Sequence, residues 1–154
     1  MSYNYGAENR NRVKETYYLL LKSSLIYSSI LWLCIMLFPQ IFASLFTSDT
    51  ALLSFTKTAL RIYLASLFLF GIQIACQMAF TSLGNAKASI LVAVTRKFIL
   101  LLPLIYLMPH IYTDNQSIAV YMAEPIADAI AVTFTAILFF FQFRKAMASI
   151  PDKD

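Results

Sequence analysis

Long apolar runs restrict the fold of this chain more than any other feature. Four runs lie at about 18–38, 60–83, 86–108 and 118–143. A helix needs about 20 apolar residues to cross the roughly 30 Å hydrocarbon core of a bilayer. Of the 154 residues, 60% are hydrophobic and 13% are charged, whereas soluble domains are about half apolar and a quarter charged. The chain is therefore predicted to be an all-α, polytopic membrane protein with four transmembrane helices.

Turn-forming residues mark the ends of these runs. Pro39 closes the first run, Gly84-Asn85 offers a left-handed stop after the second, and Pro109 is expected to end the third. Residues 40–46 indicate a short interfacial helix, and Ser48 or Asp49 is expected to cap the turn of helix that leads into the second run. The predicted organisation is a cytoplasmic N-terminal segment, a four-helix transmembrane domain and a cytoplasmic tail, at 1–17, 18–146 and 147–154.

The distribution of basic residues predicts the orientation. One side of the predicted spans is flanked by Arg10, Arg12, Lys14, Lys22, Lys87, Arg144, Lys145 and Lys153, and the other only by Lys57 and Arg61. By the positive-inside rule, both termini are expected on the cytoplasmic side of the cell (inner) membrane. The basic residues form no continuous patch or recognition motif, so nucleic acid is not an expected partner.

Two carboxylates lie within the fourth run, at Glu124 and Asp128, one helical turn apart. The run is about 39 Å long as a helix, enough to cross the bilayer core. A charged side chain near the middle of such a helix costs on the order of 2.5–3.5 kcal/mol by insertion scales. Buried acidic groups usually face a water-filled cavity or a cationic partner, and in transporters they often carry protons. The first interpretation is therefore part of a membrane transporter.

A possible partner lies in the third run. Arg96 is about ten residues into that run, roughly 15 Å from its cytoplasmic end, and Asp128 is roughly 22 Å deep in the fourth. An arginine side chain spans this difference, so we hypothesise an Arg96–Asp128 pair that lowers the cost of burying both charges. For Lys97, next to Arg96, the alternative to a role inside the bundle is that its side chain snorkels to the cytoplasmic interface.

A second polar stripe, on the second run, consists of Ser66, Gln73, Gln77 and Thr81. These glutamines are candidates for a solute pathway together with Arg96, Glu124 and Asp128, and interhelical packing is the alternative for them. The alternative for Arg96 and Asp128 is that they form a structural clamp with no role in transport. The alternative for Glu124 is that it lies near the outer face and is simply solvated. The sequence contains no metal-ligand cluster, nucleophile–base set or phosphate-binding loop, so neither an enzyme nor a bound cofactor is expected.

Several short motifs cover nearly the whole chain: Asn4-Tyr5-Gly6-Ala7, Arg12-Val13-Lys14, Leu37-Phe38-Pro39, Leu45-Phe46-Thr47 with Asp49, Leu83-Gly84 with Lys87, and Ala123-Glu124-Pro125-Ile126-Ala127-Asp128. Together these motifs resemble multidrug and toxic compound extrusion (MATE) transporters, and they occur in the family's order. The resemblance implies a twelve-helix antiporter made of two six-helix lobes, which exports cationic drugs against Na⁺ or H⁺. It also implies that this chain carries helices nine to twelve, part of the second lobe, and that the remaining helices are its partners.

On this resemblance, Gln73, Gln77, Glu124 and Asp128 line the cavity of the C-terminal lobe, with Arg96 as counter-charge. Aromatic and methionine side chains suit lipophilic, drug-like cations as substrates. Protonation of a buried carboxylate would release a bound cation and couple export to proton entry. Two alternatives remain: a complete small four-helix exporter that acts as a homo-oligomer, and a non-transporting membrane subunit or remnant. Lipid-linked sugar flippases share the wider architecture, but the motifs favour drug exporters.

Overall fold

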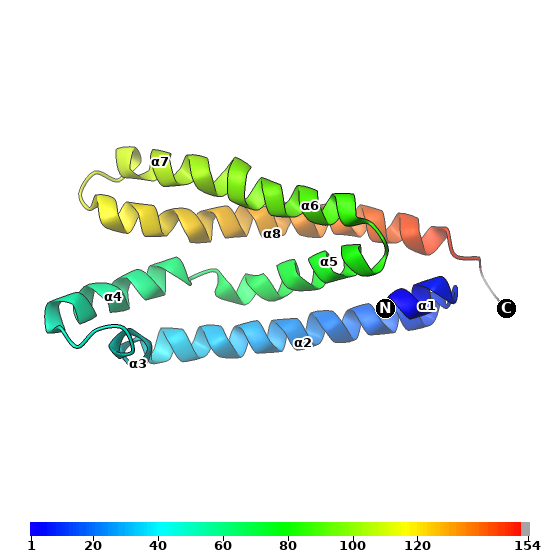
Figure 1. Cartoon of the computed structure of the whole chain (residues 1–154), viewed down its shortest axis with the longest axis horizontal. Helices are drawn as coiled ribbons and strands as arrows, with labels where there is room; N and C mark the ends of the chain where they lie inside the picture. The colour runs from blue at the N-terminus through cyan, green and yellow to red at the C-terminus, as the bar shows by residue number, and fades with distance from the viewer. Residues whose placement is uncertain (152–154) are drawn as a thin grey trace.

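The computed structural model describes residues 1–151, and this part is all-helical. The end of the predicted tail, including Lys153, lies outside the described residues. Four helices in the described part are long and apolar enough to cross a membrane: Arg10–Leu37, Thr50–Ser82, Ala86–Ile111 and Gln116–Ala148. The predicted architecture of four membrane-spanning helices is therefore confirmed (Figure 1).

The first spanning helix is α2 (Arg10–Leu37), which follows the short helix α1 (Ser2–Gly6). The Asn9 side chain accepts a hydrogen bond from the Arg12 N–H and caps the start of α2. Beyond α2, Pro39 occupies the first turn of α3 (Pro39–Ser44), where its missing N–H costs no helical hydrogen bond. The short helix predicted at 40–46 is therefore present, shifted by one or two residues.

The second spanning segment is broken. It begins as α4 (Thr50–Tyr63), continues through the 3₁₀ turn η1 (Leu67–Leu69) and ends as α5 (Phe70–Ser82). Asp49 caps α4 by accepting hydrogen bonds from two backbone N–H groups. Gly84 has a φ of 75°, the left-handed conformation that the sequence predicts at this stop. The expectation of one uninterrupted helix over 60–83 is wrong at residues 64–69.

The third spanning segment consists of α6 (Ala86–Val94), a π-helical stretch η2 (Thr95–Leu101) and α7 (Leu102–Ile111). Pro109 does not end it, because the helix continues to Ile111 and the Tyr112 N–H still donates to the Met108 carbonyl at 2.8 Å. The fourth is α8 (Gln116–Ala148), which passes through Pro125 without interruption.

The spanning helices pack side by side, and α8 takes a central position. It contacts α4 and α5 on one flank and η2 and α7 on the other, while α2 packs against α5 (Figure 1). Four buried alanines at four-residue spacing, Ala119, Ala123, Ala127 and Ala131, allow close approach along α8. Helix α1 and the C-terminal end of α8 lie at the same end of the bundle (Figure 1).

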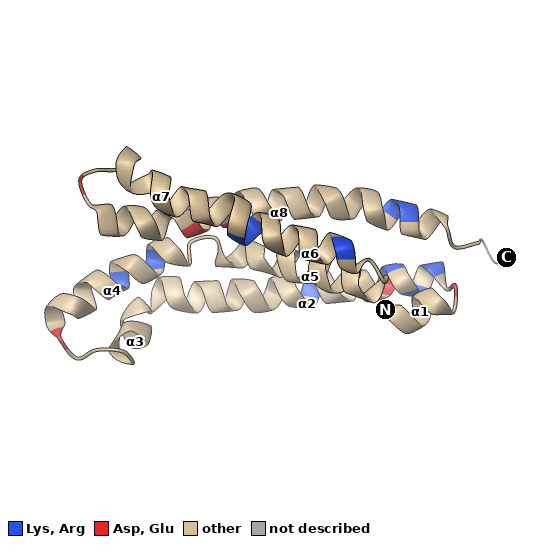
Figure 2. Cartoon of the chain, turned by 45° about the horizontal axis from the view of Figure 1, so that its top comes forward, with Lys and Arg blue, Asp and Glu red and all other residues tan. Residues whose placement is uncertain are grey.

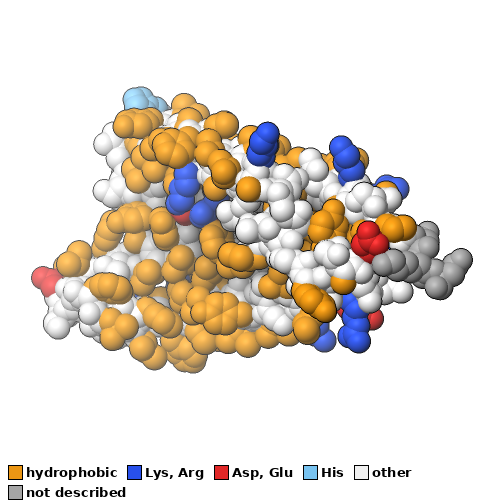
Figure 3. All heavy atoms as spheres, turned by 45° about the vertical axis from the view of Figure 1, so that its right-hand side comes forward, with side chains coloured by type: hydrophobic (Ala, Val, Ile, Leu, Met, Phe, Trp, Pro, Cys, Tyr) orange, Lys and Arg blue, Asp and Glu red, His pale blue; other side chains and the backbone are white. Residues whose placement is uncertain are grey.

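Many large apolar side chains are exposed, and apolar side chains cover much of the face seen in Figure 3. Leu19, Ile30 and Phe141, for example, are 66%, 57% and 65% exposed. Soluble proteins rarely expose contiguous apolar patches of this kind, whereas lipid tails solvate them favourably. With the lengths of the four helices, this surface identifies a multi-pass membrane protein.

Candidate functional site

Four charged side chains meet between the third and fourth spanning segments. Figure 2 shows that the ribbon positions of basic and acidic residues lie close together there, in the middle of the bundle. Arg96 donates through Nε to Asp128 Oδ1 at 2.6 Å and through Nη2 to Glu124 Oε1 at 3.1 Å. Lys97 Nζ lies 3.6 Å from the same Glu124 oxygen. We call Arg96, Lys97, Glu124 and Asp128 the charge cluster. Its two cations and two carboxylates give a formal net charge of zero.

Three members of the charge cluster are well shielded. The side chains of Asp128, Glu124 and Arg96 are 8%, 9% and 16% exposed, whereas that of Lys97 is 52% exposed. Charges are costly to bury in a membrane protein unless they are paired and hydrogen-bonded. The fork of the guanidinium meets this need for both carboxylates, because it presents separate donors to each.

Two further side chains complete the surroundings of the charge cluster. Ser66, at the break of the second spanning segment, donates through its hydroxyl to Asp128 Oδ2 at 3.1 Å. The guanidinium carbon of Arg96 lies 4.7 Å from the ring centroid of Phe70, a cation–π contact. Asp128 therefore has one partner at each carboxylate oxygen.

The broken segment that carries Ser66 and Phe70 is anchored to α2. Ser28 Oγ donates to the Phe68 carbonyl at 3.0 Å, and Trp32 Nε1 donates to the Ala65 carbonyl at 3.0 Å. These bonds satisfy carbonyls that the break removes from the helical ladder, as backbone at membrane depth requires. Discontinuous helices of this kind are typical of binding sites in transporters.

Close packing with α2 strengthens the anchor. A Cβ atom at Gly71 would lie 2.6 Å from Ser28 Oγ and 2.7 Å from the Ser24 carbonyl oxygen. Only glycine therefore fits where α5 begins.

The π-helical stretch η2 places the cations of the charge cluster. Arg96 and Lys97 are its second and third residues. A π-helix has a wider turn than an α-helix and changes the direction of the side chains that follow, and such segments occur frequently at functional sites. Here it lets two consecutive cations reach Glu124 on the same neighbouring helix.

The two glutamines lie on α5, away from these contacts. Gln73 is only 3% exposed, and its side-chain oxygen is buried with no hydrogen-bond partner among the described residues. Gln77 is half-buried, one turn further along the helix. In the part of the chain that the structure describes, no hydrogen bond joins either side chain to the charge cluster.

The hypothesised Arg96–Asp128 pair is present, and the alternative of a solvated Glu124 is wrong because Arg96 and Lys97 enclose it. Sequence reasoning missed two contacts. Ser66 belonged to the predicted polar stripe of the second run, but only the break turns it towards Asp128. The contact of Phe70 had no signal in the sequence, because nothing distinguishes Phe70 from the other phenylalanines of the run.

Within residues 1–151, no group of three or more His, Cys, Asp or Glu side chains could hold a metal ion.

A multi-pass helical bundle with paired charges inside it belongs to the class of polytopic membrane proteins that includes solute transporters. The chain belongs to the MatE family, whose model matches residues 1–107. The resemblance to MATE transporters seen in the sequence motifs is thereby confirmed.

Two solved structures support this assignment. The MATE multidrug transporter DinF-BH in complex with R6G is 32% identical over 94% of this chain, with a TM-score of 0.83. A structure described only as "protein A" is 33% identical over 94% of the chain, also with a TM-score of 0.83. This chain covers 32% of the length of each. No curated protein matches it.

Proposed function

We propose that this chain forms part of a multidrug efflux transporter that exports lipophilic cationic compounds by antiport with H⁺ or Na⁺. Membership of the MatE family and the similarity to a MATE multidrug transporter support this proposal. Because the chain spans about a third of that transporter, further transmembrane helices of a longer protein are its proposed partners. The chain acts in transport and catalyses no chemical conversion.

The observation that carries the proposal is the unequal pairing of the two carboxylates in the charge cluster. Asp128 is held by Arg96 at 2.6 Å and by Ser66 at 3.1 Å. Glu124 shares Arg96 and has Lys97 at 3.6 Å as its second partner, and half of the Lys97 side chain is exposed. Glu124 is therefore the carboxylate whose partner a cationic compound can replace, and Asp128 keeps Arg96 in place.

The coupling step in this proposal takes place on Glu124. A proton that binds a Glu124 oxygen removes its negative charge and with it the attraction for a bound organic cation. A sodium ion would compete for the same oxygens. The unpartnered oxygen of buried Gln73 adds an acceptor for a donor group on the compound. Gln77 lies one helical turn further along α5 and belongs to the same proposed pathway.

Binding of R6G tests the proposal, because this compound is bound in the DinF-BH structure. The 154-residue chain in lipid nanodiscs is titrated with R6G by equilibrium dialysis, at several pH values and with or without Na⁺. Glu124→Gln is expected to lower the affinity roughly tenfold and to abolish its dependence on H⁺ or Na⁺. Asp114→Asn, the same kind of change in the exposed loop before α8, is the control and should leave the affinity unchanged.

If Glu124→Gln binds R6G as tightly as the parent, with the same pH and Na⁺ dependence, the proposed site is wrong. The complete pairing of the charge cluster favours a second candidate, a structural clamp between the third and fourth spanning helices. A clamp predicts that Glu124→Gln and Asp128→Asn lower stability while R6G binding stays at the parent level. Stability measured on the same samples separates the two functions.

We also propose that both termini face the cytoplasm in the inner membrane. The shared location of α1 and the C-terminal end of α8, and the excess of basic residues near them, support this orientation (Figure 1). Single cysteines at Ser2 and Asp114, in a chain whose own two cysteines are replaced by alanine, test it. A membrane-impermeant maleimide should label position 114 in intact cells and position 2 only after lysis. The reverse pattern would refute the orientation.

A further inference from the structure

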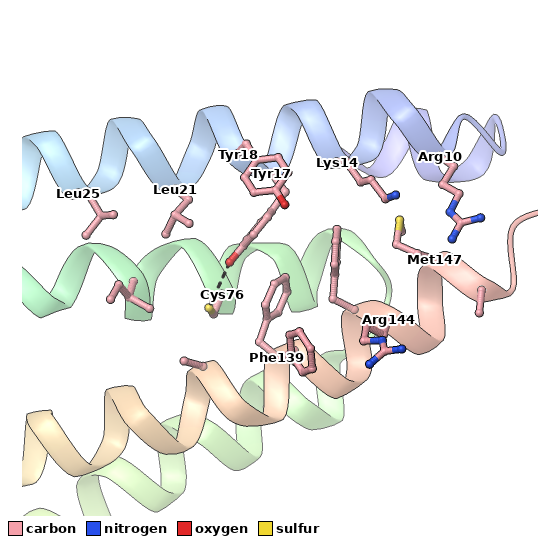
Figure 4. A pocket seen from close by; sticks show the side chains of 15 residues that line it. Arg10, Lys14, Tyr17, Tyr18, Leu21, Leu25, Cys76, Phe139, Arg144 and Met147 are labelled. Carbon is pink, nitrogen blue, oxygen red and sulfur yellow. Dashed lines mark hydrogen bonds between the residues drawn. The ribbon is translucent and has the colours of Figure 1, made fainter.

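A groove of about 680 Å³ runs between α2, α5 and α8, at the end of the bundle where α1 and the end of α8 lie (Figure 4). It is distinct from the charge cluster, because none of the proposed pathway residues lines it. α2 and α8 form its walls, and α5 lies between them (Figure 4). The proposed export function makes no use of this groove.

The floor of the groove is aromatic and well packed. The rings of Tyr17 and Phe139 stack with centroids 4.6 Å apart, and those of Phe139 and Phe143 stack 5.1 Å apart. Tyr17 is 9% and Phe139 is 4% exposed, and the Tyr17 hydroxyl lies 3.7 Å from Cys76 Sγ (Figure 4). This floor is fixed by its own contacts, so the groove does not depend on a ligand to keep its shape.

The rim of the groove is basic. Arg10 and Lys14 on α2 and Arg144 on α8 line it, and no acidic side chain does so among the described residues (Figure 4). Within residues 1–151, neither Lys14 nor Arg144 forms an ion pair with a carboxylate. Three cations at one end of an apolar channel match the chemistry of an anionic headgroup joined to a hydrocarbon chain.

The length of the groove fits one leaflet of a bilayer. Lys14 and Leu25, which both line it, are eleven residues apart on α2, or roughly 16 Å along the helix axis. One leaflet contributes about half of the roughly 30 Å hydrocarbon core. A headgroup held at the basic rim therefore places its acyl chain along the aromatic floor, and the chain stays within that leaflet.

We propose that this groove is a binding site for an anionic phospholipid of the leaflet nearest α1 and the C-terminal end of α8. The phosphate lies among Arg10, Lys14 and Arg144, and an acyl chain lies along Tyr17, Phe139 and the neighbouring apolar wall. An apolar protein helix fits the site less well, because it would bury Lys14 and Arg144 without a counter-charge. The site does not depend on the proposed export activity.

Lipid titration of the purified chain tests this site. The full chain in a neutral detergent is titrated with phosphatidylglycerol or phosphatidylcholine, and bound lipid is counted by native mass spectrometry. The parent should bind one phosphatidylglycerol tightly and prefer it over phosphatidylcholine. Lys14→Gln/Arg144→Gln should weaken phosphatidylglycerol binding roughly thirtyfold, since each cation near a headgroup contributes about a fivefold factor.

Lys145→Gln is the matched control. Lys145 follows Arg144 on the same helix and carries the same charge, but it lines a different surface pocket. Its substitution should leave phosphatidylglycerol affinity within about twofold of the parent, because no headgroup contact is removed. Equal losses in Lys145→Gln and in the double variant would mean general surface electrostatics and would overturn the site.

Ala136→Trp tests the acyl part of the site, because Ala136 lines the groove and a tryptophan there fills it. This variant should reduce phosphatidylglycerol binding although all three cations remain. Inorganic phosphate at millimolar concentration should not displace the lipid. Displacement by phosphate, undiminished binding to Ala136→Trp, equal affinity for the two lipids, or a dimer that excludes lipid from the groove would each refute the proposal.

Discussion

Replacing Arg96 by methionine removes the cation that both buried carboxylates share. The variant lacks the donors of the 2.6 Å bond to Asp128 and of the 3.1 Å bond to Glu124. Among the described residues, Glu124 then keeps the half-exposed Lys97 at 3.6 Å, and Asp128 keeps the hydroxyl of Ser66. Removing one partner of a buried pair costs about 3–5 kcal/mol, so Arg96→Met should lower the free energy of unfolding by that amount.

A double-mutant cycle with Asp128→Asn isolates the contribution of the Arg96–Asp128 pair. Asp128→Asn alone should cost about 1–3 kcal/mol, because it weakens one charged hydrogen bond while Arg96 keeps Glu124. The double variant should cost less than the sum of the two single variants by about 1–3 kcal/mol. Lys97→Gln is the control and should cost less than about 1 kcal/mol, because its side chain is 52% exposed.

The single tryptophan of the chain offers the assay. Trp32 donates to the Ala65 carbonyl and packs edge to face on Phe68, so its fluorescence reports on the broken segment beside the charge cluster. Reversible unfolding in mixed micelles with increasing dodecyl sulfate gives the free energy of each variant. An unchanged midpoint for Arg96→Met, or purely additive losses in the cycle, would show that the charge cluster contributes no net pairing energy.

Three further changes test the helix junctions. Gly71→Ala should destabilise the chain by about 1–3 kcal/mol, because the new methyl group meets α2 at 2.6–2.8 Å, whereas Gly6→Ala has nothing within 4 Å and serves as its control in thermal melts. Trp32→Phe should cost about 0.5–1.5 kcal/mol by removing the bond to the Ala65 carbonyl, and amide exchange of residues 64–69 should speed up while that of α8 does not. Asp49→Ala should cost about 0.5–2 kcal/mol through loss of the α4 cap, and an unchanged melting temperature would contradict the capping role.

The sequence predicted those features that depend on a single helix or on the depth of a residue in the membrane. The length of the apolar runs predicted the four spanning helices, and the helical rise placed Arg96 within side-chain reach of Asp128. Asp49 as a cap and Gly84 as a left-handed stop follow from local backbone chemistry. Such features need no knowledge of neighbouring helices.

The features that the sequence did not reveal are set by contacts between helices. Residues 64–69 contain no proline or glycine to mark a break, and the carbonyls freed there are satisfied by Ser28 and Trp32 on another helix. Burial of Glu124 depends on the second arm of the Arg96 guanidinium, which depth alone does not place. Pro109 was expected to end the third segment, but the helix continues through it to Ile111 and the Tyr112 N–H still donates to the Met108 carbonyl.

The separation of the charge cluster along the chain has a consequence for biogenesis. Glu124 and Asp128 are synthesised 28 and 32 residues after Arg96. If the third segment left the translocon alone, its arginine would enter lipid without a counter-ion, at a cost of about 2.5–3.5 kcal/mol on insertion scales. The third and fourth segments are therefore expected to leave the translocon together as a helical hairpin, already neutralised when it reaches the lipid.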